Sequence, residues 1–389
     1  MTAERHLSTD GFAFRTAFFY AISCILMGVQ LPFFPIWLQA KGFDAGQVGA
    51  ILSATALMRI VSVTSATRAA DHHFTIRTVI VTFAFATAAG FTLLGFTDTL
   101  WLIVALTVFT AFSHTPAMAL LDAYALRGLK PRGRAYGPVR LWGSASFIVA
   151  NLAAGLAFDI IDTRDLIWLL SASAIATAMA AIWLMPLPQT APLSDHAQVS
   201  RPLWRNSGFL AIVVAASLVQ SSHAVYYGFS TIGWKAAGFD GVAIGALWAI
   251  GVIAEIVLFA LSGRLPPAFG PVPLLVIGAG GAVLRWTAMA FDPPGWTLPL
   301  LQCLHGLSFG ASHLGAIGFI AHAAPEGRGA TAQGYFSVMQ GITLSGCMLL
   351  AGFLYERVGM LSYLAMALTA LLGGLIAVAV WLRAPASRS

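Results

Sequence analysis

Five ionisable side chains stand inside long apolar runs of the sequence, where charge is costly. They are Arg59, Asp122, Arg140, Glu255 and Arg285. Each costs roughly 2.5–3.5 kcal/mol at the centre of a membrane helix on insertion scales. A chain keeps such groups when they pair with one another or face water. They therefore predict either ion pairs that fix helices to one another or a polar binding site near the midplane of a membrane.

The spacing of these residues suggests two acid–arginine pairs. Asp122 and Arg140 flank a basic loop, so their two helices are expected to be neighbours. A guanidinium binds a carboxylate through two parallel hydrogen bonds, so Arg140 could hold Asp122 when the site is empty and a substrate carboxylate when it is loaded. Arg140 could equally be one more basic residue of the loop. Glu255 and Arg59 hold equivalent positions in an internal repeat, which suits either a proton-coupling acid near an arginine or a static pair.

The elements that position these residues are predicted from composition and hydrophobic runs. Of the 389 residues, 58% are hydrophobic and 9% are charged, whereas a soluble domain has about 25% charged residues. Runs of about 20 apolar residues cross a bilayer as helices. We expect such helices at 12–38, 47–66, 76–96, 101–123, 138–158, 166–185, 207–234, 242–262, 272–291, 296–321, 332–354 and 360–382. The predicted fold class is an all-α polytopic membrane protein with 12 transmembrane helices.

A repeat divides the twelve predicted helices into two related sets. Gly42-Phe43-Asp44 recurs as Gly238-Phe239-Asp240 at an offset of 196, and Gly49-Ala50 recurs as Gly245-Ala246 in the same register. We therefore predict an N-terminal six-helix half at 1–185, a cytoplasmic linker at 186–206 and a C-terminal six-helix half at 207–389. Two pseudo-symmetric six-helix bundles around a central polar cavity are the organisation of major facilitator transporters, which work by alternating access.

The distribution of basic residues predicts the orientation. With the N-terminus inside, only Lys41, Arg164, Lys235 and Arg357 fall in loops on the outer side. The positive-inside rule then places both termini in the cytoplasm, in a cell inner membrane. The same rule accounts for the net charge of +6, so no nucleic-acid partner is expected.

Several stretches resemble one family. Tyr136-Gly137-Pro138-Val139-Arg140-Leu141-Trp142-Gly143-Ser144, the segment from His223 to Ser230, Leu284-Arg285-Trp286 and Leu304-His305-Gly306 occur in the order found in the phenylpropionate permease family. That family belongs to the major facilitator superfamily and is related to the lactose permease-type sugar/proton symporters. The resemblance covers most of the chain.

The resemblance implies roles for individual residues. It places substrate contacts at Asp122, Arg140 and Glu255 and proton coupling at Arg285 and His305. Beside it, we expect Trp142, Tyr226, Tyr227 and Phe309 to line the cavity, where they could stack on an aromatic substrate, and Arg59 and His313 to join Glu255 in the polar network. Arg68, Asp71 and Arg77 resemble the gating loop of the superfamily, although its leading glycine is missing. Lactose permeases carry a carboxylate three residues after the histidine, where this chain has Ser308, so coupling must use Glu255, Asp122 or another ion.

The predicted function is secondary active transport of a small organic substrate by proton symport, with an aromatic carboxylate such as 3-phenylpropionate as the expected substrate. A sugar or nucleoside symporter and an efflux carrier are the alternatives. A membrane-embedded lipid enzyme is a remote one, since it would rest on His72, His73 and Asp71 alone. We expect a monomer in the lipid bilayer, with no enzyme activity. No P-loop or metal-ligand spacing is present, so neither a cofactor nor a metal is expected.

Overall fold

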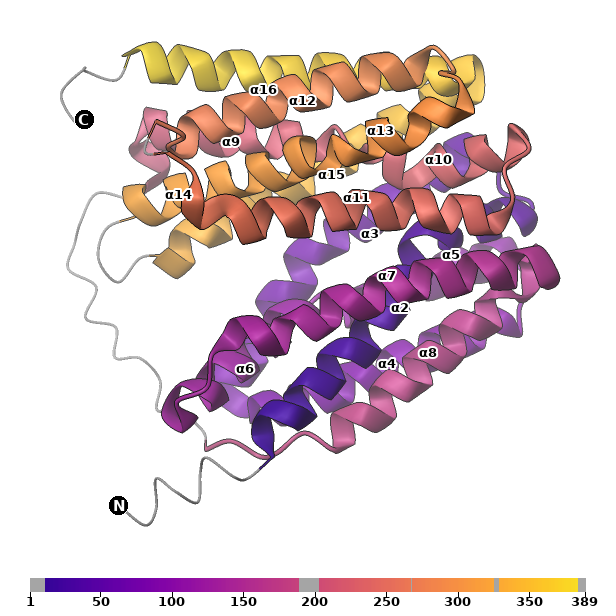
Figure 1. The fold of residues 1–389 in the computed structure, drawn as a ribbon. Coiled ribbons are helices and arrows are strands. Elements are labelled where there is room, and N and C mark those ends of the chain that lie inside the picture. Colours follow the sequence, from indigo (N-terminus) through magenta and orange to yellow (C-terminus); the bar gives the residue numbers. More distant parts are fainter. Residues whose placement is uncertain (1–10, 189–202, 267, 325–328, 384–389) are drawn as a thin grey trace. The chain divides into compact units, whose positions relative to one another are not determined.

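The structure is a computed structural model that describes residues 11–188, 203–266, 268–324 and 329–383. In the first half of the chain the helices are α2 (Phe12–Ala40), α3 (Ala45–Arg68), α4 (Ile76–Gly95), α5 (Leu100–His114), α6 (Ala117–Leu129), α7 (Tyr136–Ile160) and α8 (Leu166–Ile182). In the second half they are α9 (Ser207–Ser221), α10 (Ala224–Ala236), α11 (Gly241–Leu261), α12 (Pro271–Ala290), α13 (Leu298–Cys303), α14 (Ser312–Ala323), α15 (Gly329–Val358) and α16 (Tyr363–Arg383) (Figure 1).

These helices confirm the predicted all-α membrane architecture. Eleven stretches of the described chain are long and apolar enough to cross a membrane, and the last, Thr331–Arg383, contains both α15 and α16 with a short turn between them. Counting those two helices separately gives the predicted twelve crossings. Most of the predicted linker and both chain ends lie outside the described residues.

Breaks in three crossings create irregular backbone where polar side chains gather. Thr115 and Pro116 separate α5 from α6, because proline lacks the N–H that would continue the helix. Ser222 and His223 separate α9 from α10. Between α13 and α14 the chain forms a π-helical turn at Gly306–Ala311, a feature frequent at functional sites.

The repeated Gly-Phe-Asp sequence has a structural explanation. Gly42 and Gly238 adopt left-handed backbone angles, with φ of 98° and 90°, which end α2 and α10. The following phenylalanine N–H groups return to carbonyls five residues back. Asp44 then accepts a hydrogen bond from the Gln47 N–H at 2.7 Å and Asp240 one from the Ala243 N–H at 2.7 Å. Each repeat is therefore a helix end followed by the N-cap of the next helix.

The described chain divides into two compact units. Unit 1 comprises 1–43, 57–194 and 234–249, and unit 2 comprises 44–56, 195–233 and 250–389. Unit 1 contains α2 and α4 to α8, together with the start of α11, and unit 2 contains the remaining helices of the second half together with the start of α3. The division of the sequence at 185 and 206 stays a prediction.

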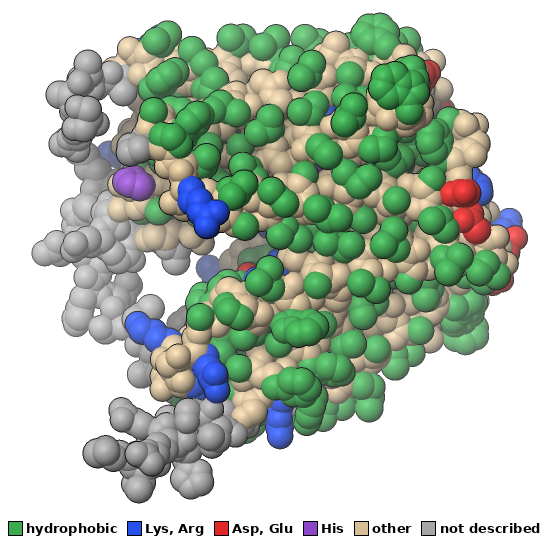
Figure 2. Space-filling view, in the orientation of Figure 1, with side chains coloured by type: hydrophobic (Ala, Val, Ile, Leu, Met, Phe, Trp, Pro, Cys, Tyr) green, Lys and Arg blue, Asp and Glu red, His purple; other side chains and the backbone are tan. Residues whose placement is uncertain are grey.

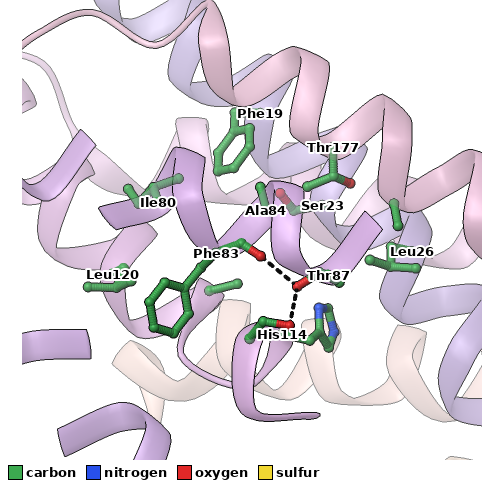
Figure 3. A pocket seen from close by; sticks show the side chains of 13 residues that line it. Phe19, Ser23, Leu26, Ile80, Phe83, Ala84, Thr87, His114, Leu120 and Thr177 are labelled. Atoms are coloured by element: carbon green, nitrogen blue, oxygen red, sulfur yellow. Dashed lines mark hydrogen bonds between the residues drawn. The ribbon is translucent and has the colours of Figure 1, made fainter. Parts of the chain in front are cut away.

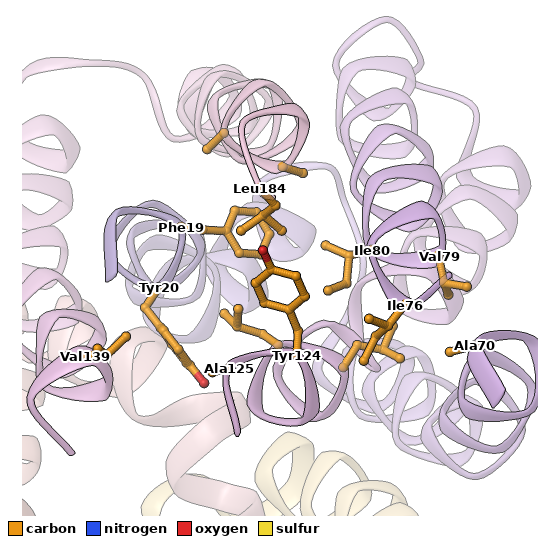
Figure 4. Packing of buried hydrophobic residues seen from close by; sticks show 14 of the residues in the cluster. Phe19, Tyr20, Ala70, Ile76, Val79, Ile80, Tyr124, Ala125, Val139 and Leu184 are labelled. Carbon is orange, nitrogen blue, oxygen red and sulfur yellow. The ribbon is translucent and has the colours of Figure 1, made fainter. Parts of the chain in front are cut away.

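The core of unit 1 is formed by aromatic and branched side chains from α2, α4 and α6. Phe19, Ile76, Ile80 and Leu184 surround the ring of Tyr124 (Figure 4). The Tyr124 hydroxyl donates a hydrogen bond to the Met185 carbonyl at 2.8 Å, so the buried polar tip is satisfied.

Apolar side chains also cover the outer surface of the helices. Figure 2 shows hydrophobic side chains along their flanks and charged ones near their ends. On α16, Leu368, Leu372 and Leu375 project from one face with 61%, 57% and 56% of their surface exposed. A stripe of exposed leucines suits a helix that lipid surrounds.

Candidate functional site

Arg285 is the centre of a buried polar cluster in unit 2. It lies on α12 and is fully buried. Its Nη1 donates to His305 Nδ1 at 2.9 Å and to Ser308 Oγ at 3.3 Å, and its Nη2 donates to Gln302 Oε1. Neutral acceptors therefore hold this guanidinium, which has a fixed positive charge.

These contacts determine where His305 carries its proton. Arginine has no acceptor atom, so His305 Nδ1 must be unprotonated in this arrangement. A neutral His305 ring then carries its hydrogen on Nε2, which lies 3.8 Å from Glu255 Oε2. That separation is longer than a hydrogen bond. The Glu255 side chain keeps 21% of its surface exposed, so its carboxylate can contact water or a bound ligand.

Ser308 extends the cluster to a second histidine. Because its oxygen accepts from Arg285, its only hydrogen is free to be donated to His223 Nε2, 3.3 Å away. His223 Nδ1 is then the donor to the Gln220 carbonyl at 3.1 Å. His223 is fully buried at the break between α9 and α10. The polar hydrogens of His305, Ser308 and His223 thus all point away from Arg285.

Aromatic rings enclose the Arg285 guanidinium. Its Cζ lies 4.5 Å from the ring centroid of Tyr226 and 4.6 Å from that of Trp286, within the range of cation–π attraction. The Tyr227 ring is half-buried and lies 5.6 Å from those of Tyr226 and His223. Stacking therefore adds to the hydrogen bonds that position the cation.

A ladder of parallel rings runs along the irregular helix that carries His305. His305 and Phe309 stack at 5.2 Å, and Phe309 and His313 stack at 5.7 Å with an interplanar angle of 6°. Phe309 and His313 are only half-buried. Part of each ring is therefore accessible to another group.

Small residues bring α11 close enough to place Glu255 beside His305. A Cβ atom on Gly306 would lie 2.9 Å from the Ala254 carbonyl oxygen, and one on Gly310 would lie 2.9 Å from Leu258 Cδ2. Both glycines face α11. Such small-xxx-small spacing lets membrane helices approach closely.

A second polar cluster lies in unit 1 around Asp122 on α6. Its Oδ1 accepts from the Tyr20 hydroxyl at 2.5 Å and from the Tyr136 hydroxyl at 2.8 Å. The guanidinium of Arg140 on α7 lies 5.4 Å from the Tyr20 ring. The tyrosines thus take the place beside Asp122 that the sequence suggested for Arg140, which stays available for another anion.

Other residues predicted for these sites have different surroundings. Trp142 is 61% exposed and lies about 200° around α7 from Arg140, so it points away from the Asp122 cluster. Arg59 is exposed on α3 and makes no hydrogen bond or ion pair with the residues that the structure describes.

The predicted gating loop is described in part. Arg68 is exposed at the end of α3. Arg77 donates at 2.6 Å to the carbonyls of Ile182, the last residue of α8, and of Leu184, two residues beyond it. Its contacts are those of a helix C-cap. The Asp71 side chain lies outside the described residues.

Comparisons with known proteins agree with this architecture. Residues 13–366 match the model of the MFS_1 like family. The chain is 32% identical over 358 residues to the "Probable 3-phenylpropionic acid transporter" of Escherichia coli (strain K12), covering 88% of this chain and 91% of that relative. It is 29% identical to the "Maltose permease" of Geobacillus stearothermophilus, covering 87% and 86%. The crystal structure of the nucleoside transporter NupG superposes with a TM-score of 0.80 at 16% identity, covering 95% and 99%. The predicted major facilitator fold is confirmed.

Proposed function

The chain belongs to the MFS_1 like family, and we propose on that premise that this secondary transporter carries a small aromatic carboxylate, such as 3-phenylpropionate, together with protons. Family and fold make it a multi-pass membrane transporter of a small-molecule substrate and not an enzyme. The relative named for 3-phenylpropionic acid supports the substrate class. A monomer in the inner membrane, with both termini in the cytoplasm, is part of the proposal.

The surroundings of Arg285 carry the proposal. A buried guanidinium costs free energy unless an anion compensates it, and the contacts of Arg285 are with neutral acceptors and ring faces. A substrate carboxylate would supply the missing negative charge. Its aromatic ring would pack against the exposed parts of Tyr227 and Phe309. Arg140 is the second candidate partner for the carboxylate.

Proton coupling follows from the hydrogen-bond directions around His305. A proton added to Nδ1 would face the Arg285 Nη1–H group across 2.9 Å, so that contact would have to break. The released guanidinium could then bind a carboxylate, and the charged imidazole would remain beside Glu255. Proton binding and anion binding therefore favour each other, and this linkage is reciprocal. Symport is the expected outcome.

A sugar/proton symporter is the second candidate. Asp122 already accepts two phenolic hydroxyls from Tyr20 and Tyr136. Sugar hydroxyls could replace them with the same geometry. The maltose permease among the relatives favours this alternative.

The test is uptake of radiolabelled 3-phenylpropionate into proteoliposomes, with the outside made more acidic than the lumen. We expect accumulation that collapses when a protonophore removes the pH gradient. Arg285→Lys and Arg140→Ala should each weaken the apparent affinity by about 10- to 100-fold, the value of one charge-assisted hydrogen bond. Arg264→Ala, at an exposed helix end, is the matched control and should transport like the parent.

Two results would decide against this assignment. If Arg140→Ala and Arg285→Lys both carried 3-phenylpropionate as well as the parent, the anion site would be elsewhere. If the parent accumulated maltose or a nucleoside but no aromatic acid, the substrate class would be wrong. Monodisperse elution of each variant in detergent separates a lost site from a lost fold.

A further inference from the structure

Unit 1 encloses a small cavity that neither the Asp122 cluster nor the Arg285 cluster includes. Its volume is about 20 Å³, and α2, α4, α5, α6 and α8 contribute to its wall (Figure 3). Most of the wall is apolar. Its polar side chains are those of Ser23, Thr87, Ser113, His114 and Thr177.

Two of the polar groups that line this cavity lack hydrogen-bond partners. The hydroxyl of Ser23 is buried and has no partner among the described residues. His114, the last residue of α5, is half-buried and makes no hydrogen bond or ion pair within the same part of the chain. A buried polar group without a partner destabilises the fold, and native structures hold few of them.

The neighbouring hydroxyls leave acceptor capacity toward the cavity. Thr87 Oγ1 donates to the Phe83 carbonyl at 2.8 Å, and Ser113 Oγ donates to the Thr110 carbonyl at 3.0 Å. Thr87 Oγ1 also lies 3.1 Å from Ser113 Oγ, to which it can donate in place of Phe83 (Figure 3). Each hydroxyl uses its hydrogen within the protein and keeps a lone pair.

We infer that this cavity is the binding site of one resident water molecule, held between Ser23 and His114. A cavity needs roughly 10–15 Å³ and two to four polar partners to hold a water, whereas cavities that stay dry are apolar. The water would satisfy the Ser23 hydroxyl and one His114 ring nitrogen, and it would donate to Thr87 or Ser113. The wall contains no carboxylate, so the site does not suit a metal cation.

This water would lie at the break between α5 and α6, two helical turns before Asp122. Proline at 116 leaves the helix without one backbone hydrogen bond there. The water would link α2 to the break through Ser23. It thereby positions the segment that carries Asp122.

The test compares two serines that both lack a hydrogen-bond partner. Ser62 is fully buried on α3 and its hydroxyl has no partner, but it does not line the cavity. Removing such a dry hydroxyl in Ser62→Ala should leave the Tm of the purified protein unchanged or raise it. Ser23→Ala should instead lower the Tm by about 2 °C or more, because it removes a partner of the bound water.

A double variant makes the test independent of cavity size. In a His114→Phe background the water has no imidazole partner, because phenylalanine fills the place of the ring. Ser23→Ala should therefore lower the Tm less in this background than in the parent. Equal Tm losses in the two backgrounds would overturn the inference. So would a Ser23→Ala variant that is as stable as Ser62→Ala, since the cavity would then be dry.

Discussion

At His305, we propose that the position of one hydrogen determines what Arg285 can bind. While the imidazole accepts from the guanidinium at Nδ1, that cation is occupied; once Nδ1 is protonated, the two groups repel. Glu255, 3.8 Å from Nε2, is the acid that can stabilise the charged ring. In the proposed switch, protonation of Nδ1 would make Arg285 exchange one hydrogen-bond partner for another.

A glutamine at position 305 tests this switch. In His305→Gln the amide oxygen can still accept from Arg285, but the side chain cannot take up a proton. We expect facilitated exchange of substrate to persist. The parent should accumulate substrate by about tenfold per unit of imposed pH gradient if one proton is coupled, and the variant should not accumulate it. His322→Gln, on an exposed histidine, serves as the control and should accumulate substrate normally. Undiminished accumulation by His305→Gln would exclude the proposed coupling.

At this scale the sequence predicts which residues carry charge better than it predicts their partners. Arg285 and Glu255 are identifiable because ionisable groups in apolar runs are few, whereas His305 is identified through the family resemblance. His223, Ser308 and Gln302 complete the cluster, yet serine and glutamine in a membrane helix are too common to single out. Tyr20 and Tyr136 come from two different helices, and their convergence on Asp122 depends on packing that periodicity does not encode.

Helices α11 and α12 both pack closely on the π-helical turn at Gly306–Ala311, and this packing positions the site. Gly306 allows the approach of α11, since a Cβ there would lie 2.9 Å from the Ala254 carbonyl, a backbone atom that cannot rotate away. The approach sets the Glu255–His305 separation. The sequence indicates close packing through its glycines but not which helix faces them.

Gly306→Ala should therefore separate α11 from the π-helical turn. Overpacking of this kind costs about 1–3 kcal/mol, which should lower the Tm, and the longer Glu255–His305 distance should reduce proton-driven accumulation. Gly334→Ala is a matched control, because nothing lies within 4 Å of a Cβ at this exposed helix position. Helix propensity predicts that this control is neutral or stabilised by up to about 1 kcal/mol. A Gly306→Ala variant as stable and as well coupled as the control would contradict the packing argument.

The start of α11 receives two acidic caps within unit 1. Asp240 bonds the Ala243 N–H in its own first turn. Asp159, near the end of α7, accepts from the Gly241 N–H at 2.7 Å and the Val242 N–H at 3.1 Å. Carboxylates at a helix N-terminus also favour the helix dipole. The sequence motif contains Asp240, whereas Asp159 is separated from α11 by 82 residues along the chain.

Replacing Asp159 measures the contribution of the second cap. Asp159→Ala should lower the free energy of unfolding by about 0.5–2 kcal/mol, the usual cost of a lost N-cap. Asp159→Asn keeps an acceptor oxygen and should lose less. Thermal unfolding in detergent gives both values. Equal stability of the parent and both variants would mean that the two hydrogen bonds contribute nothing to α11.

On the scale of the whole molecule, the repeat of 196 residues predicts related halves, and the structure explains why the repeated motif recurs. Each compact unit nevertheless includes a short segment from the other half of the sequence. Residues 44–56 belong with unit 2 and residues 234–249 with unit 1. These segments overlap at the repeat offset, so the exchange is itself symmetric. A division by chain order cannot anticipate it, because hydrophobic runs specify helices and not their partners.

The orientation of the chain is a prediction for the intact membrane, and single cysteines can test it. Arg134 lies exposed in the loop before α7, and Thr99 lies exposed before α5. The positive-inside rule places the first in the cytoplasm and the second outside. In a background without the native cysteines, a membrane-impermeant maleimide added to whole spheroplasts should label Thr99→Cys and spare Arg134→Cys. Lysis should make both reactive, which controls for accessibility. Labelling of Arg134→Cys alone before lysis would mean that the topology is inverted. The positive-inside rule would then not explain the net charge of +6.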